Sequence, residues 1–300
     1  MTKLVECIPN FSEGQRKEVI ESLAQIISEV PGVILLDYSS DTSHNRSVFT
    51  FVGTPEGAKE AAFRAAQKAV TEIDITKHKG EHPRMGAVDV IPFVPVKGMT
   101  MHECIELSKE VAVRISNELG LPVYLYEESA SKPERANLAT IRKGQFEGMA
   151  AKIKTPGWEP DFGKAEIHPT AGAVAVGARM PLVAYNINLS TSDIQIANNI
   201  AKIIRESSGG LKYVKAIGVK LEDRNIAQVS INMTNYEKTP LYRVFELVRV
   251  EAQRYGTGII GSEIIGLTPM NALIDSAKYY LQIEGFDDKK QVLENYLMQG

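Results

Sequence analysis

The sequence predicts an α/β (α+β) fold of two similar βαββαβ units, at residues 1–180 and 181–300. Strand-like and helix-like stretches follow one another in the same order in each half, and a Gly- and Pro-rich segment precedes the change from one half to the other. The order matches the split-βαβ, ferredoxin-like unit, in which helices lie on one face of a sheet. A chain of 300 residues, 44% of them hydrophobic, can bury two such cores.

In the first half, apolar residues of the first helix recur at helical spacing, and the expected strands are rich in β-branched and aromatic residues. Thr54 followed by Pro55 is typical of a helix start, with the N-cap and N1 places filled. In chain order we expect a strand at Leu4–Pro9, a turn at Asn10–Gly14, a helix at Arg16–Ser28, strands at Gly32–Ser39 and Arg46–Gly53, a helix from about Pro55 to Glu72, a strand at Ala87–Pro95 and a helix at Thr100–Leu119.

The second half repeats this order, with Ser192 as the expected cap of its first helix. Two helices then follow, the first opened by Thr268 and Pro269. In chain order we expect a strand at Leu182–Leu189, a helix at Asp193–Ser207, strands at Val214–Leu221 and Ile226–Thr234, a helix at Pro240–Tyr255, a strand at Gly258–Ile265 and a last helix at Lys289–Met298.

The segment Thr155–Arg179 precedes the change of halves and is dense in Gly and Pro. A flexible linker would be rich in Gly and Ser and would not carry Trp158, Phe162 and His168. Long irregular segments in compact proteins tend to be functional. We therefore expect this segment to contact a ligand.

Composition excludes several classes of function. A net charge of −3 and a pI near 6.0 supply no basic field for nucleic acid. The N-terminus lacks the pattern of a secretory signal, and no apolar run has the length of a membrane span, so we expect a cytoplasmic protein without a membrane partner. Cys7 and Cys104 form no CxxC pair, which favours buried thiols over a disulfide or a metal site.

Two polar clusters are candidate sites. Asp37–Arg46 joins two expected strands and carries Asp37, Asp41, His44 and Arg46, either as a solvated hairpin or as polar groups gathered at one end of a sheet, where ligands commonly bind. The stretch Glu81–Gly86 comes directly before a strand. Its His82 can change charge near neutral pH and its Arg84 can bind a carboxylate bidentately.

No metal-binding His spacing, GxSxG, P-loop or GxGxxG pattern accompanies these clusters. The spacing of the histidines therefore argues against a zinc hydrolase; the five are His44, His78, His82, His102 and His168. The missing sequence motifs likewise exclude serine hydrolase, nucleotide triphosphatase and dinucleotide-binding functions. Proton transfer by an imidazole remains as the chemistry that the clusters favour.

Four stretches, in order, resemble the signature segments of the formiminotransferase domain family, and together they cover almost the whole chain. They are VECIPNFSEG at Val5–Gly14, DTSHNRSVFTFVG at Asp41–Gly53, EHPRMGAVDVIPFVPV at Glu81–Val96 and GAVAVGARMPLVAYNINL at Gly172–Leu189. The resemblance implies two α/β subdomains with folate between them. It also implies transfer of the formimino group from N-formimino-L-glutamate to nitrogen-5 of tetrahydrofolate, in the degradation of histidine to glutamate, with no metal.

The resemblance makes His82 the catalytic histidine, because His82 stands in the family's H-P-R-x-G stretch. The family's folate-binding loop matches Gly163, Lys164, Ala165, Glu166, Ile167, His168, Pro169, Thr170, Ala171 and Gly172. From residue type, Arg46, Arg84 and Arg179 are candidate clamps for the carboxylates of glutamate and folate. Asp37 or Asp41, and His44 in the same cluster, are candidates for orienting His82 or the substrate.

Two other functions stay open at this point. The same His82 chemistry would serve transfer of a formyl group between 5-formyltetrahydrofolate and glutamate, and a non-catalytic protein could instead bind folate and deliver it to a separate cyclodeaminase. The longer members of the family continue into a cyclodeaminase domain and this chain stops at Gly300, so we expect any deamination to be done by another protein. The resemblance also implies a homodimer.

Overall fold

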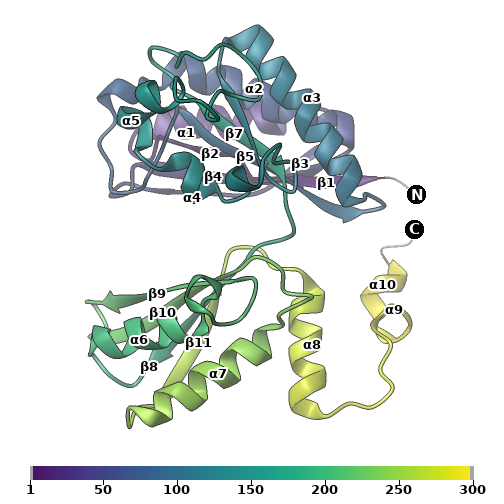
Figure 1. The fold of residues 1–300 in the computed structure, drawn as a ribbon. Coiled ribbons are helices and arrows are strands. Elements are labelled where there is room, and N and C mark those ends of the chain that lie inside the picture. The colour runs from purple at the N-terminus through teal and green to yellow at the C-terminus, as the bar shows by residue number, and fades with distance from the viewer. Residues whose placement is uncertain (1–2, 298–300) are drawn as a thin grey trace. The chain divides into compact units, whose positions relative to one another are not determined.

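The computed structural model describes residues 3–297, which form two compact units with their boundary in the chain between Arg179 and Met180 (Figure 1). Both units are mixed α/β structures, and the predicted class of two similar βαββαβ subdomains is confirmed. Within the described residues, none of the helices combines the length and the apolar composition that a membrane crossing requires.

The first unit is built on a seven-stranded sheet. Its βαββαβ part places four strands in the antiparallel order β3-β4-β1-β5, and β7 and β6 extend that sheet parallel to β5. The elements are β1 (Leu4–Cys7), β2 (Asn10–Phe11), α1 (Lys17–Ser28), β3 (Val33–Asp41), β4 (Arg46–Gly53), α2 (Pro55–Glu72), η1 (Ile75–Lys77), β5 (Val88–Lys97), α3 (Met101–Leu119), β6 (Val123–Glu127), η2 (Pro133–Arg135), α4 (Leu138–Arg142), α5 (Gln145–Lys152) and β7 (Val174–Ala178).

Several details of the first unit differ from the prediction. The strand β1 ends at Cys7, β5 runs on to Lys97, and β6 and β7 were not predicted. Asn10 and Phe11, expected in a turn, form the short strand β2, because both pair with β4 and with β5. The strand β3 runs on to Asp41, two residues past the expected end at Ser39, because Ser40 and Asp41 pair with Ser47 and Arg46 of β4.

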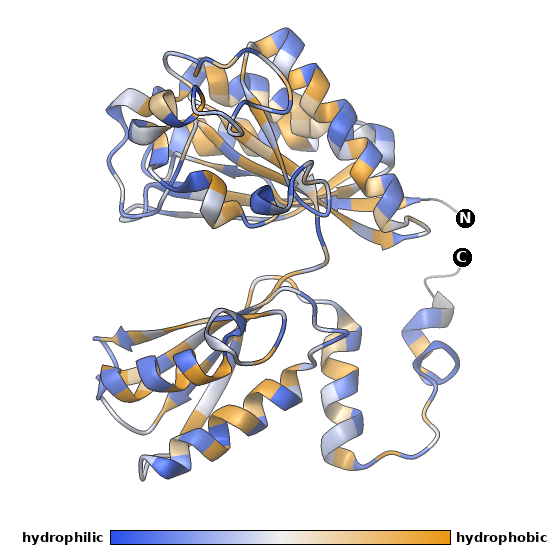
Figure 2. Ribbon diagram, viewed as in Figure 1, coloured by the Kyte–Doolittle hydropathy of each residue, from blue (hydrophilic) through white to orange (hydrophobic). Residues whose placement is uncertain are grey.

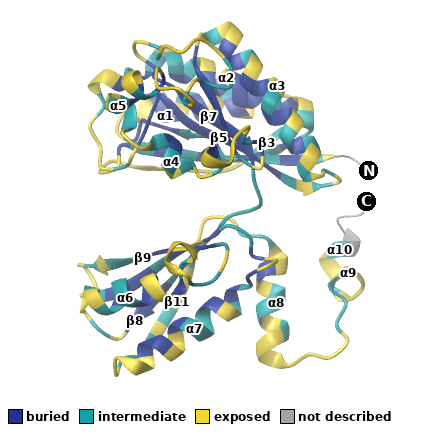
Figure 3. Cartoon of the chain, viewed as in Figure 1, coloured by how far each residue is buried: buried dark blue, intermediate teal, exposed yellow. Residues whose placement is uncertain are grey.

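The long helices α1, α2 and α3 cover one face of this sheet, as predicted. Alternate residues of β6 and β7 point into the core beneath these helices, among them Val123 and Leu125 of β6. The other two residues that alternate with them in β6, Tyr124 and Tyr126, belong to a second, smaller core. Figure 3 shows β5 and β7 as buried strands of this sheet.

The second core lies on the opposite face of the sheet and was not predicted. It is closed by Ile141 of α4, by Met149 of α5 and by Trp158 of the following loop. Because α4 has five residues and α5 eight, neither carries enough turns to produce a clear helical periodicity in the sequence. The helices of this small layer also carry side chains that belong to the candidate site.

The second unit has a four-stranded antiparallel sheet in the order β11-β8-β10-β9, with apolar residues gathered between strands and helices (Figure 2). Its elements are β8 (Val183–Leu189), α6 (Ile194–Ile204), η3 (Glu206–Ser208), β9 (Val214–Leu221), β10 (Ile226–Met233), α7 (Leu241–Arg254), β11 (Ile259–Ile265), α8 (Met270–Leu281), α9 (Asp288–Gln291) and α10 (Leu293–Leu297). The helix predicted at Lys289–Met298 is thus divided in two, and Met298 lies outside the described residues. The first helix is capped by Asp193 rather than Ser192.

The two faces of this second sheet differ in chemistry. Odd-numbered residues of β8, such as Val183 and Ile187, pack into the core under α6 and α7. On the other face Gln228 Nε2 donates to Asn188 Oδ1 and to Glu263 Oε1, each at 2.9 Å. Gln228 and Asn188 are both buried, so this is a satisfied polar network rather than an apolar surface.

Both cysteines are free and buried, as predicted. Burial raises the pKa of Cys104 to about 12 and holds the pKa of Cys7 well above its ordinary value. Thiols in this state are protonated and unreactive at neutral pH.

Candidate functional site

The structure brings the two polar clusters of the sequence together. The loop between β3 and β4 and the segment before β5 are joined by hydrogen bonds from Glu81 N to Ser43 O (3.2 Å) and from Asn45 Nδ2 to Lys79 O (3.0 Å). Gly80 packs so closely on this loop that an added Cβ would lie 2.3 Å from His44 O. His82 is therefore held against the β3–β4 connection that carries Arg46.

His82 is fixed through its Nδ1 atom. That atom lies 2.7 Å from the carbonyl oxygen of Pro83 and 3.2 Å from Arg46 Nη1. A carbonyl oxygen can only accept a hydrogen bond, so the shorter contact assigns the proton to Nδ1. Nε2 is then the unprotonated, basic nitrogen of the ring.

The surroundings keep this imidazole neutral. Burial, together with the positive charges of Arg46 and Arg142, lowers the pKa of His82 to about 4, although Asp89 and the Pro83 carbonyl act in the opposite direction. At neutral pH the ring is therefore uncharged and able to accept a proton.

Asp89, at the start of β5, organises the charges around His82. Its Oδ2 accepts from Arg46 Nη1 at 2.7 Å and also from Arg142 Nη2, while its Oδ1 accepts from the backbone N of Met85 at 3.0 Å. Burial acts to raise the pKa of Asp89, but Arg142 and Arg46 outweigh it, so the pKa lies below its usual value and the carboxylate stays charged. Arg46 is further held by Asn10 Oδ1, at 2.7 Å.

An open pocket of about 310 Å³ adjoins these groups. It is lined by Ser39, Ser40, Asp41, His44, Arg46, Val48 and His82. The ring centroids of His44 and His82 are 6.1 Å apart, so two imidazoles and a guanidinium face one small volume.

The two aspartates expected to orient His82 do not do so. Asp41 lies in the same pocket but accepts from the backbone N of His44 at 2.7 Å and pairs with His44 Nδ1 at 3.1 Å. These bonds from His44, backbone first, lower the pKa of Asp41. Asp37 lies farther along β3, opposite Thr50, and is not part of the pocket lining. His82 is oriented instead by the Pro83 carbonyl.

Arg84, expected to bind a substrate carboxylate, has an internal partner instead. Its Nη1 and Nη2 form a bidentate pair with Glu147 of α5, at 2.9 and 2.6 Å, and the Phe146 backbone N donates to Arg84 O at 2.9 Å. Only 7% of Arg84 is exposed. Its guanidinium therefore fastens the His82 segment to α5, since the fork that would bind a ligand is already used.

Arg179 lies outside this cluster. Its backbone N donates to Phe93 O at 3.0 Å, and its side chain hydrogen-bonds to Tyr126. Phe93 is four residues along β5 from Asp89, which is roughly 13 Å at the rise of a strand. Of the three arginines expected as clamps, only Arg46 lines the pocket beside His82.

The loop matched to folate binding, Gly163–Gly172, meets the His82 segment at its C-terminal end. Gly86 and Gly172 form a bridge, Ala87 N donates to Ala171 O at 2.9 Å and Ala173 N donates to Met85 O at 3.0 Å. Gly163, Lys164, Ala165 and Glu166 at the other end are exposed, as are Pro169 and Thr170. The loop thus has surface available to a ligand and a rigid connection to the His82 segment.

His168 shapes that loop from within. Its Nδ1 accepts from the backbone N of Ala171 at 3.0 Å, and its backbone forms reciprocal 3.0 Å hydrogen bonds with Gly172. Burial lowers the pKa of His168, so the ring is neutral and suited to accept these bonds. Gly172 has a φ of +71°, and a Cβ there would lie 2.3 Å from Met85 O, so the turn requires glycine.

Sequence reasoning missed three members of this site: Asn10, Asp89 and Arg142. Asp89 did carry a signal, because a single carboxylate inside the apolar run AVDVIPFV is buried and must be paired. The sequence around Arg142 carried no such signal, since Arg142 lies in a polar stretch 53 residues from Asp89.

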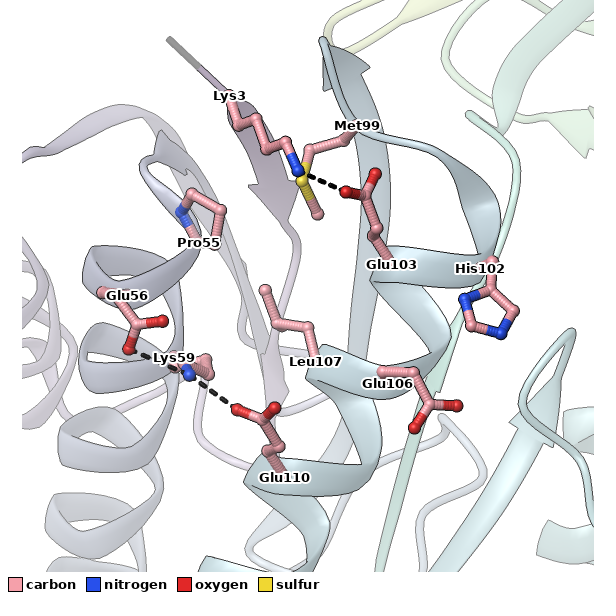
Figure 4. Close-up of a pocket in the computed structure, with 10 residues that line it drawn as sticks. All are labelled: Lys3, Pro55, Glu56, Lys59, Met99, His102, Glu103, Glu106, Leu107 and Glu110. Carbon is pink, nitrogen blue, oxygen red and sulfur yellow. Dashed lines mark hydrogen bonds and ion pairs between the residues drawn. The ribbon is translucent and has the colours of Figure 1, made fainter.

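A second pocket, of about 220 Å³, lies between α2 and α3 (Figure 4). Its ion pairs join Lys3 to Glu103, and Lys59 to Glu56 (2.9 Å) and Glu110 (2.6 Å). Its one histidine, His102, is exposed in the first turn of α3. Because both lysines of this pocket are already held in ion pairs, we assign the function to the His82 pocket.

Comparisons with known proteins identify the family of the chain. A family model described as the formiminotransferase domain, N-terminal subdomain, matches residues 4–179, and one described as the formiminotransferase domain matches residues 184–295. The chain is 63% identical to the glutamate formimidoyltransferase of Streptococcus pyogenes serotype M1 over 298 residues, which is 99% of this chain and 100% of that protein.

Two further relatives extend the comparison. The glutamate formimidoyltransferase of Thermoplasma acidophilum is 49% identical over 95% of this chain and 94% of its own length. The formimidoyltransferase-cyclodeaminase of Mus musculus is 47% identical over 95% of this chain and 53% of its own length. Matches in both units, together with near-complete coverage at 63% identity, mean that the chain belongs to the formiminotransferase family.

Proposed function

We propose that this protein is a glutamate formimidoyltransferase, which moves the formimino group of N-formimino-L-glutamate to nitrogen-5 of tetrahydrofolate. The observation that carries the proposal is a neutral imidazole, His82, fixed beside a pocket that Arg46 also lines. The family and the names of its relatives supply the substrates.

The proposed reaction needs one group that moves a proton twice. Nitrogen-5 attacks the amidine carbon, a new C–N bond forms and the attacking nitrogen becomes a strongly acidic ammonium. His82 accepts that proton at Nε2 and donates it to the glutamate nitrogen, whose bond to the carbon then breaks and releases glutamate. A base with a pKa of about 4 suffices, because the ammonium is a strong acid and the resulting imidazolium readily gives up its proton.

We further propose that the loop Gly163–Gly172 binds tetrahydrofolate and that Arg46 faces a substrate carboxylate. The hydrogen bonds between this loop and the His82 segment support the first role, since they would fix the distance between the bound folate and the base. The exposed Lys164 is suited to a carboxylate of the folate tail.

The remaining parts of the proposal rest on the family. We propose a cytoplasmic homodimer whose product is used by a separate cyclodeaminase, an activity that appears in the names of several relatives. Light scattering would measure the mass in solution. We expect twice the chain mass of 33.0 kDa, and a mass equal to one chain would contradict the dimer.

A transferase assay with the purified protein tests the activity. N-formimino-L-glutamate and N-formyl-L-glutamate would each be offered with tetrahydrofolate, beside His82→Ala and the matched control His102→Ala. We expect formimino transfer that falls by about two to four orders of magnitude in His82→Ala and persists in His102→Ala. If only N-formyl-L-glutamate and tetrahydrofolate gave turnover, the donor in this proposal would have to be replaced by the formyl compound. If the protein bound folate without any turnover, it would be a folate-binding protein rather than an enzyme.

A further inference from the structure

Two arginines next to His82 share one carboxylate, since Asp41, which also lines the pocket, is bound to His44. Arg46 and Arg142, whose side chains are 12% and 13% exposed, both bind one oxygen of the fully buried Asp89. Two positive charges therefore share one negative charge in a largely dry environment, where an uncompensated charge is costly.

Two further observations indicate that the surplus charge is directed at a ligand. The Nε atom of Arg142 is buried and has no hydrogen-bond partner among residues 3–297. The two guanidinium groups are also at most about 6 Å apart, since each is one charge-assisted hydrogen bond from the same oxygen. An anion between them would satisfy the free donor and restore neutrality.

We propose that Arg142, acting with Arg46, binds a carboxylate of the glutamate donor, and that Asp89 positions the two arginines for it. This inference rests on the proposed function, which supplies a donor with two carboxylates. The adjoining pocket is lined by Arg46 and His82 and not by Arg142, so the donor would reach the cluster from the side of Arg46. Arg142 thereby takes the clamping role that Arg84, bound to Glu147, cannot fill.

Binding measurements test this assignment without requiring turnover. The probes are N-formyl-L-glutamate and its two monoamides, N-formyl-L-glutamine and N-formyl-L-isoglutamine, titrated by calorimetry. We expect the wild-type protein to bind the dicarboxylate roughly 10- to 100-fold more tightly than one of the monoamides, as the loss of a charge-assisted hydrogen bond implies. Arg142→Met should lose that preference.

Two variants and a spectroscopic measurement control for misfolding. Arg114→Met removes an arginine that pairs with Glu60 on α2, outside the site, and should bind like the wild type. Arg142→Met leaves Asp89 paired with Arg46, so it should fold. In the wild type, the ¹⁵N signal of Arg142 Nε should shift with the dicarboxylate and stay in place with the monoamide that lacks the bound carboxylate. This last measurement does not depend on any variant.

The outcomes separate this inference from the proposed function. Unchanged affinity in Arg142→Met, or an Arg142 Nε signal that ignores the ligand, would overturn the inference even if the wild type transfers formimino groups. Absence of transfer by a wild type that still binds the dicarboxylate through Arg142 would overturn the proposed function and leave the anion site.

Discussion

The two units share one topology and differ in what covers the sheet face away from their long helices. In the first unit that face carries α4 and α5, which bring Arg142 to Asp89 and Glu147 to Arg84. In the second unit it carries the network of Asn188, Gln228 and Glu263. All five histidines lie in the first unit. The βαββαβ order is therefore only a scaffold, and the site arises from what was added to one copy of it.

The His82 segment is held at both of its ends. Glu147 and Phe146 of α5 bind Arg84, two residues after His82, while the bridge between Gly86 and Gly172 closes the other end. A loop that is fixed at both ends keeps a base in place before the substrate arrives, which is how positioned groups gain their catalytic advantage.

The largest expected effect comes from breaking this attachment at Gly86. A Cβ there would lie 2.1 Å from Ala173 O and 2.7 Å from Ala171 O, so Gly86→Val cannot keep the bridge to Gly172. We expect a loss of about 3 kcal/mol or more in the free energy of unfolding, at the upper end of point mutations, and loss of transfer activity. Urea denaturation and the transferase assay would measure both.

Gly148 of α5 provides the matched control, because a Cβ there would meet no atom within 4 Å. Gly148→Ala should keep activity and gain up to about 1 kcal/mol, as expected for replacing glycine in a helix. If Gly86→Val were as stable and active as Gly148→Ala, the attachment would not be what holds His82.

A smaller effect is expected in the second unit. Gln228→Met removes the donor to Asn188 and Glu263 and leaves the buried amide oxygen of Asn188 without it. We expect a loss of about 1–3 kcal/mol, the cost of unsatisfied buried polar groups, confined to β8, β10 and β11. Hydrogen exchange read by mass spectrometry would locate it, and faster exchange in β5 as well would contradict the independence of the two networks.

The sequence predicted the scaffold better than the site. Periodic apolar runs specify long helices and strands, so both βαββαβ units could be inferred from one chain. His82 and Arg46 were also identified, but as members of two separate clusters. Their contact depends on the backbone bonds between the β3–β4 loop and the segment before β5, which no local pattern encodes.

The assignment of the arginines shows why. Arg84, Arg142 and Arg179 have the same side chain, and only tertiary partners decide their roles: Arg84 has Glu147, Arg179 has Tyr126, and Arg142 shares Asp89 with Arg46. Arg142 itself lies on α4, and Glu147, the partner of Arg84, lies on α5; both helices are too short to be predicted. Missing that layer meant missing Arg142, whereas Asn10 and Asp89 lie on the strands β2 and β5.

The smallest expected effect is a pH dependence that only the first unit can show. The pKa of His82 is about 4 in the native state, against an ordinary value near 6.5. Between these values the unfolded chain binds a proton that the native site does not, so the native state loses stability as pH falls from about 6.5 to about 4. We expect at most about 1 kcal/mol between pH 7 and pH 5, because His82 is only partly buried.

Denaturation at the two pH values, compared between the wild type and His82→Gln, would isolate this contribution. The variant lacks the titrating ring, so its stability should change less over the same interval, while His102→Gln, which removes an exposed imidazole, should behave like the wild type. Transfer activity should persist to pH values below 6, since the base stays unprotonated there. A loss of activity on the acid side with a midpoint near pH 6.5 would mean that Arg46 and Arg142 do not hold His82 neutral. The role of these charges would then be limited to binding the substrate.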